Sequence, residues 1–169
     1  NMAPPDGAVA LAQGDVDMFC GWGGSLRRAL EHGNVLLTGA EKTALGILVW
    51  DVTSTTAQFA NENAEVLSTF LGVTAASNAM WNSGGFTSLM LPHIARDAGM
   101  DEAATADTMS TFAFPSVSNQ LSSAWLGGGG QSFLKGVADV FVNAGEIPGA
   151  RGSYAGAVNT DGLNTVASQ

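Results

Sequence analysis

Trp22 and Asp51 are the residues whose type and setting best suit the binding of a small ligand. Trp22 lies between two glycines and follows a short stretch in which every second residue is apolar. We therefore expect a tight turn that exposes its indole. Asp51 is the only charged residue in the apolar run Leu45–Thr53, where a carboxylate is costly unless a cation or a hydrogen-bond donor satisfies it. We therefore predict that Asp51 holds the ammonium of a zwitterion and that Trp22 covers the ligand.

These residues also have purely structural explanations. Trp22 could pack in the interior, and for Trp50, which lies in the apolar run, core packing is the first expectation and ligand contact the second. Asp51 could instead form a salt bridge with Arg27 or Arg28. Both interpretations stay open at this stage.

Nucleophilic catalysis or metal binding would first use Cys20, His32 and His93. Their spacing suggests neither a nucleophile with its base nor a set of metal ligands, so we predict no catalytic residue, no metal and no cofactor. The single cysteine, Cys20, excludes an internal disulfide, and we predict that it is a small core residue. The run Gly127–Gly130 lacks the preceding strand and the following Lys-Ser/Thr of a phosphate loop.

The elements that would position the candidate residues alternate between helix and strand. Ser25 is predicted to cap a helix, with ligand contact as the second possibility. The predicted order is helix Pro5–Gln13, strand Val16–Cys20, helix Leu26–His32, strand Val35–Thr38 and the apolar run Leu45–Thr53. This alternation is typical of an α/β fold with a parallel sheet, in which ligands bind beside the carboxyl ends of strands and near helix N-termini.

The rest of the chain is predicted to be mainly helical. Apolar residues recur at helical spacing in Glu62–Met80, and further helices are expected at Phe86–Ala98, Asp101–Met109 and Gln131–Asn143. The polar tail after Asn159 is expected to fray.

A series of short motifs follows in one order along nearly the whole chain: Pro4-Pro5, Ala12–Asp17, Trp22, Gly33–Thr38, Trp50–Val52, Phe59-Ala60, Glu65-Val66, Phe133-Leu134, Gly145–Ala150 and Ser153-Tyr154. This order resembles the second half of periplasmic substrate-binding proteins of the taurine and aliphatic-sulfonate ABC transporters, and it looks closest to the taurine-binding type.

The resemblance implies a type II periplasmic binding protein fold, with two α/β lobes joined by crossing hinge strands. Residues 1–50 would belong to the second lobe, and residues 51–169 would form a hinge strand and a mainly helical return to the first lobe. The chain would then be a C-terminal portion, and the missing N-terminal half of the same protein would be a partner.

The implied function is capture of taurine or a related amino-sulfonate in the periplasm and its delivery to an ABC permease at the inner membrane. Trp22, Asp51, Trp50 and Ser25 would be the ligand-binding residues. Where the taurine type has a tyrosine this chain has Cys20, so betaine or choline could replace taurine as the ligand. The resemblance also allows a same-fold enzyme of pyrimidine-precursor metabolism or a sensor subunit.

The charge balance excludes some classes of partner. The formal net charge is −9, and the chain has only six Lys and Arg residues. Because nucleic acids and anionic membranes are bound by clustered cations, we predict neither as a partner.

Overall fold

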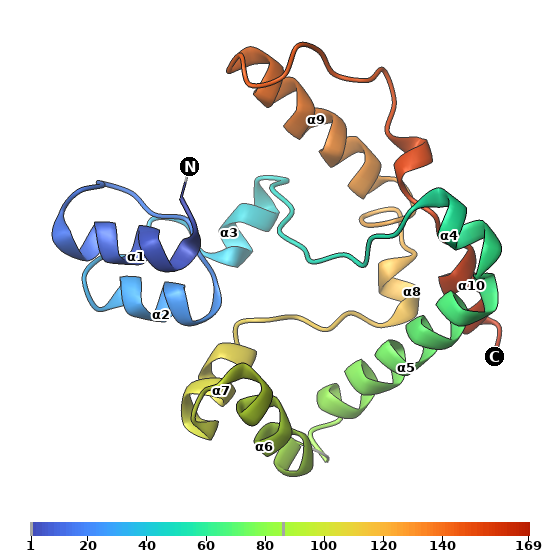
Figure 1. Ribbon diagram of the computed structural model, residues 1–169, viewed down its shortest axis with the longest axis horizontal. Coiled ribbons are helices and arrows are strands. Elements are labelled where there is room, and N and C mark those ends of the chain that lie inside the picture. The colour runs from blue at the N-terminus through green and yellow to red at the C-terminus, as the bar shows by residue number, and fades with distance from the viewer. Residues whose placement is uncertain (1, 86) are drawn as a thin grey trace. The chain divides into compact units, whose positions relative to one another are not determined.

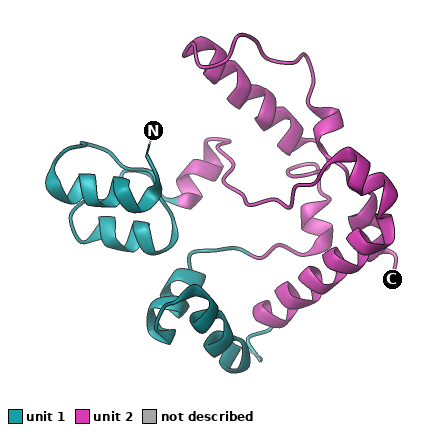
Figure 2. Ribbon diagram, in the orientation of Figure 1, with its two compact units in different colours: residues 1–38, 83–113 teal, residues 39–82, 114–169 magenta. Residues whose placement is uncertain are grey.

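The computed structural model describes residues 2–85 and 87–169, and within these residues every regular element is a helix and no strand occurs (Figure 1). The predicted α/β class and the type II periplasmic binding protein fold are therefore wrong. The chain divides into two compact units, each built from two separate stretches of sequence (Figure 2). Unit 1 contains residues 1–38 and 83–113, and unit 2 contains residues 39–82 and 114–169.

Unit 1 contains four helices: α1 (Pro4–Gln13), α2 (Gly23–Leu30), α6 (Thr87–Ala98) and α7 (Glu102–Met109). Helix α1 packs against α2, α2 against α7, and α7 against α6. The buried residues at these contacts are small: Ala8, Ala29, Ala95, Ala104 and Thr105. Small side chains let the helices approach closely, but they bury little apolar area.

Helix α1 forms as its sequence predicts. Pro4 and Pro5 stand in the first turn, where the amide that proline lacks would have no partner within the helix. Gly14 ends the helix with φ 78°, and its amide donates to the carbonyl oxygen of Leu11 at 3.1 Å.

Unit 2 contains α3 (Gly39–Ala44), α4 (Ala57–Glu62), α5 (Ala64–Asn82), α8 (Val117–Gln120), α9 (Gly129–Asn143), the 3-10 helix η1 (Ala155–Ala157) and α10 (Asp161–Ala167). Helix α10 packs against α5 and α8. Its Leu163 is only 6% exposed and is the largest buried apolar side chain of the described residues.

The predicted strand over Leu45–Thr53 is absent because its first residues end a helix instead. Gly46 adopts φ 76°, and the amide of Ile47 donates to the carbonyl oxygen of Lys42 at 2.9 Å. This is the hydrogen-bond pattern by which a left-handed glycine closes an α-helix, here α3. The following residues, up to Thr56, have no regular structure, so Asp51 does not lie on a hinge strand.

The predicted strands Val16–Cys20 and Val35–Thr38 are also wrong. The Phe19 ring lies against the backbone of Gly7 and Gly21, where an added Cβ would clash with it. A strand needs a hydrogen-bonded neighbour, and side-chain alternation alone does not supply one. Packing of Phe19 on α1 therefore replaces pairing in a sheet.

The helices predicted for the later part of the chain are confirmed, with shifted ends. They correspond to α5, α6, α7 and α9, and the predicted first residue of one of them, Phe86, lies outside the described residues. The expectation that the tail after Asn159 frays is wrong, because the tail contains α10. The backbone amide of Asp161, in the first turn of α10, donates a hydrogen bond to Oδ1 of Asn159 at 2.8 Å.

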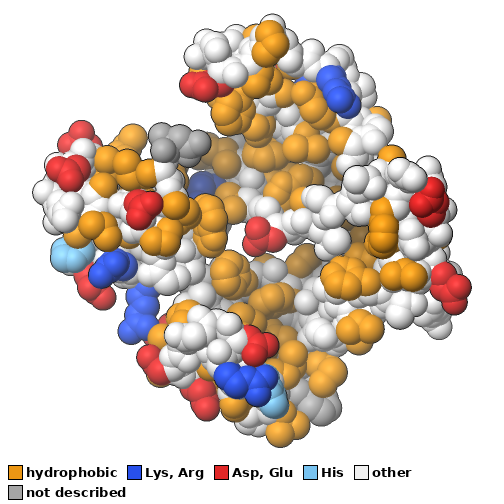
Figure 3. All heavy atoms as spheres, viewed as in Figure 1, with side chains coloured by type: hydrophobic (Ala, Val, Ile, Leu, Met, Phe, Trp, Pro, Cys, Tyr) orange, Lys and Arg blue, Asp and Glu red, His pale blue; other side chains and the backbone are white. Residues whose placement is uncertain are grey.

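Many large apolar side chains remain exposed. They occur in both units, and hydrophobic side chains cover much of the face seen in Figure 3. In the described part of the chain, no helix combines the length and the apolar character that a membrane span requires.

Candidate functional site

Trp50 forms an aromatic pair with Trp125 in unit 2. The ring centroids are 5.7 Å apart and the ring planes are inclined by 38°. The Trp50 indole also lies against Gly130 at the start of α9, so closely that a Cβ at this position would overlap the ring. The absence of a side chain at Gly130 therefore makes room for the pair.

Residues close to this pair in the sequence line a pocket of about 630 Å³, although neither indole lines it. One wall comes from Gly46 and Leu48, which precede Trp50, and the other from α9. The α9 residues are Gly129, Ser132, Phe133, Gly136, Val137 and Val140, and Ala124 completes the lining. Most of these side chains are apolar, and the pocket is a depression that is widely open to solvent.

Asp51 follows Trp50 directly in the sequence and carries a carboxylate. The residue is exposed, and within unit 2, all of which the structure describes, its side chain has no hydrogen bond and no ion pair. Arg27 and Arg28, the salt-bridge partners considered from the sequence, belong to unit 1. The Asp51 carboxylate is thus available to a ligand cation from solvent.

The glycine run before α9 is not an anion site. The amide of Gly129 donates to the Ser123 carbonyl at 2.9 Å, and that of Gly130 to the Trp125 carbonyl at 2.8 Å. These bonds fold residues 122–130 into a tight turn and occupy donors that a phosphate or sulfonate would need. The site therefore combines indole faces, an apolar wall and a carboxylate, which suits a cation rather than an anion.

Trp22 and Ser25 lie in unit 1, whereas this site lies in unit 2. Trp22 precedes α2 in an extended conformation and is 60% exposed, as the glycine-flanked turn predicted. Ser25 lies inside the first turn of α2, and the helix begins at Gly23 without a side-chain cap, so the capping prediction for Ser25 is wrong. Ligand contact by Trp22 and Ser25 stays a prediction.

The sequence interpretation brought together Trp50 and Asp51 but missed Trp125, Gly130 and Phe133. The available signal was the glycine run followed by an apolar helix, because glycines ahead of a helix indicate a close approach by another group. Nothing in the spacing identified that group as Trp50, which lies far away in the sequence.

Among the described residues, no group of three or more His, Cys, Asp or Glu side chains could hold a metal ion. Cys20 is exposed, as are His32 and His93. The prediction that Cys20 fills a core is therefore wrong. The exposed thiol and imidazoles do not contribute to the site in unit 2.

Over the residues that the structure describes, the protein is all-helical, and unit 2 carries a tryptophan pair, an apolar pocket against α9 and an exposed, unpaired carboxylate at Asp51. No family model matches the chain. No curated protein matches it. No solved structure matches it.

Proposed function

We propose that this protein binds a small organic ammonium compound, taurine or a related zwitterion in the first place, at Trp50, Trp125 and Asp51. The observation that carries the proposal is the pair of indoles 5.7 Å apart, with the exposed and unpaired carboxylate of Asp51 on the residue that follows Trp50. Indole faces attract an ammonium through their quadrupole, and the carboxylate supplies the opposite charge. The apolar wall of the pocket would receive the carbon chain.

The exposure of the site sets the expected strength of binding. Trp50 and Trp125 are half-buried and Asp51 is exposed. A cation on an indole near the surface gains about 0.5–1 kcal/mol, and an exposed ion pair gains up to about 1 kcal/mol. Each of these groups should therefore change the dissociation constant by a small factor. We therefore expect the site to be selective for an ammonium without binding it tightly.

A quaternary ammonium such as betaine or choline is a second candidate ligand. Its methyl groups fit the apolar lining from Leu48, Phe133 and Val137 better than the hydrated primary ammonium of taurine does. Both ligand classes place a cation against the same two indoles, so comparative titration separates them.

The wider role that we propose is that of a solute-binding protein located in the periplasm, which passes its ligand to an ABC permease. Its support is the order of motifs along the sequence. Uptake of radiolabelled ligand by cells that carry or lack this protein, with the permease present in both, tests this role separately from binding.

Calorimetric titration with taurine, glycine betaine, choline and ethanesulfonate tests the binding proposal. The ammonium compounds should bind, and ethanesulfonate, which has no cation, should not. Asp51→Asn should weaken binding by about twofold to fivefold. The matched control Glu146→Gln removes an exposed carboxylate elsewhere in unit 2 and should leave binding unchanged. Equal binding of ethanesulfonate, or no binding of any ammonium compound, would refute the proposal.

A further inference from the structure

Helix α5 of unit 2 has two apolar faces, of which α10 covers only one. Leu71 lies on the covered face, where a Cβ added to Gly162 of α10 would meet its Cδ1 at 2.8 Å. The other face carries Val66, Phe70, Val73 and Met80, which are 58%, 50%, 63% and 40% exposed. A helix that is apolar around most of its circumference is normally buried, so the second face lacks a covering element.

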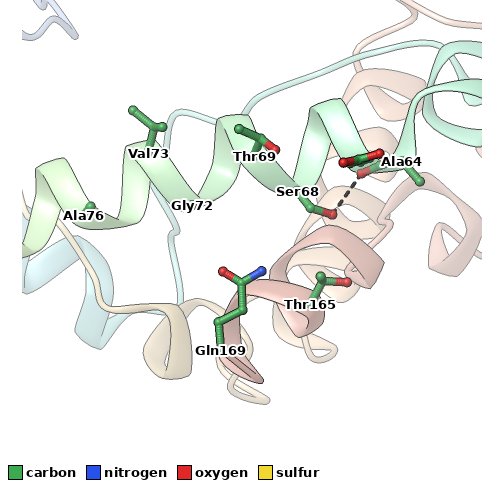
Figure 4. Close-up of a pocket in the computed structure, with 9 residues that line it drawn as sticks. Ala64, Ser68, Thr69, Gly72, Val73, Ala76, Thr165 and Gln169 are labelled. Atoms are coloured by element: carbon green, nitrogen blue, oxygen red, sulfur yellow. Dashed lines mark hydrogen bonds between the residues drawn. The ribbon is translucent and has the colours of Figure 1, made fainter.

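A groove of about 690 Å³ runs beside this face between α5 and α10. Its floor on α5 consists of small residues one helical turn apart, namely Ala64, Ser68, Gly72 and Ala76. Ser68 turns its hydroxyl back to the Ala64 carbonyl at 2.9 Å, and Gln169 reaches toward α5 from the other side (Figure 4). Val73 also lines the groove, so the groove and the exposed apolar face of α5 are continuous.

The charged residues of α5, of α10 and of the preceding helix α4 are all acidic. Helices α4, α5 and α10 carry Glu62, Glu65 and Asp161 and contain no Lys or Arg. Glu65 lines the groove at the end where α5 begins. A second copy of this chain would bring the same acids, together with a net charge of −9, against this surface. A basic partner would not face that repulsion.

We propose that the exposed apolar row Val66, Phe70 and Val73, together with the edge of the groove that Val73 shares, docks an amphipathic helix of a partner protein whose basic residues lie over Glu65. Small residues on the floor let the backbone of the docked helix approach α5, and the apolar row supplies the area that it buries. The acids at the start of α5 fix the direction of the docked helix by pairing with its basic end. This surface is separate from the ammonium site and does not depend on it.

Fluorescence anisotropy with a labelled peptide on the full chain tests the proposal. The probe is a helical peptide of about 18 residues with leucines at heptad spacing and lysines at one end. The comparison peptide replaces the lysines with glutamates. The lysine peptide should bind and lose affinity with added salt, and the glutamate peptide should bind at least about tenfold more weakly.

Substitutions locate the binding. Val73→Asp puts a charge on the apolar row at an exposed position and should weaken binding by about tenfold or more, whereas Leu89→Asp, at an equally exposed apolar residue of α6, should have no effect. Glu65→Gln should weaken binding by about twofold to fivefold and reduce its salt dependence. Wild-type affinity in Val73→Asp would overturn the proposal. So would equal binding of both peptides, or a dimer in sedimentation that Val73→Asp abolishes.

Discussion

Trp50 and Trp125 lie with their ring centroids 5.7 Å apart, and Leu48 and Ala124, close to them in the sequence, line a pocket against the apolar side of α9. The two residues are distant in sequence, and the bare backbone of Gly130 leaves the space that their contact needs. This pair is where we propose that an ammonium binds, and its packing on Gly130 gives a specific consequence for substitution.

Gly130→Ala should destabilise the protein, because the new Cβ would overlap the Trp50 ring. Displacing a packed indole costs about 1–3 kcal/mol, which exceeds the gain of up to about 1 kcal/mol from replacing glycine in a helix. Urea unfolding followed by tryptophan fluorescence measures the difference. Gly136→Ala on the same helix is the control, since no atom beyond its chain neighbours and the backbone of its own helix lies within 4 Å of its Cβ position, and it should stabilise slightly. The same effect in both variants would contradict the packing of Trp50 on Gly130.

Leu163→Ala should be among the more damaging single substitutions in unit 2. The side chain is 6% exposed and belongs to α10, which packs on α5 and α8. Truncating a buried leucine to alanine costs about 2–5 kcal/mol, and the short α10 has no other buried side chain to hold it in place. The denaturation midpoint gives the measurement. Leu89→Ala removes the same atoms at a site that is 64% exposed and should cost little. Equal losses in the two variants would show that α10 does not pack as described.

Asp101→Ala should lower stability by about 1 kcal/mol, because the Asp101 carboxylate caps α7. Its Oδ1 accepts from the Ala104 amide at 2.8 Å, and that helix also contains the buried Thr105. Thermal unfolding of Asp101→Ala and Asp101→Ser tests this, since serine can restore the cap. If the serine variant were as unstable as the alanine variant, a role other than capping would be indicated.

The sequence predicted the helices better than the overall architecture. Proline at the start of α1, Gly14 at its end and the apolar spacing in α5 are local signals, and all of them correspond to observed helices. The predicted strands failed because a strand depends on a neighbour that the sequence does not specify. In the run Leu45–Thr53, the left-handed Gly46 closed α3 instead.

The sequence predicted only part of the candidate site, because the rest of the site also depends on contacts between residues that are distant in the sequence. Asp51 and Trp50 stood out because one is a charge in an apolar run and the other is its neighbour. Trp50 nevertheless packs on Trp125 and on Gly130 of α9 and does not lie at a strand end. Long-range contacts of this kind leave no spacing in the sequence from which they could be read.

The most direct test of the ammonium site is the response of the indole NH signals in a two-dimensional NMR spectrum during titration with taurine and glycine betaine. The chain has four tryptophans, so each signal can be assigned by substitution with phenylalanine. We expect the signals of Trp50 and Trp125 to shift with the ligand and to saturate together, and that of Trp81, which packs on Phe114, to stay in place. Unmoved signals from Trp50 and Trp125 at the highest ligand concentration would contradict ammonium binding at this pair.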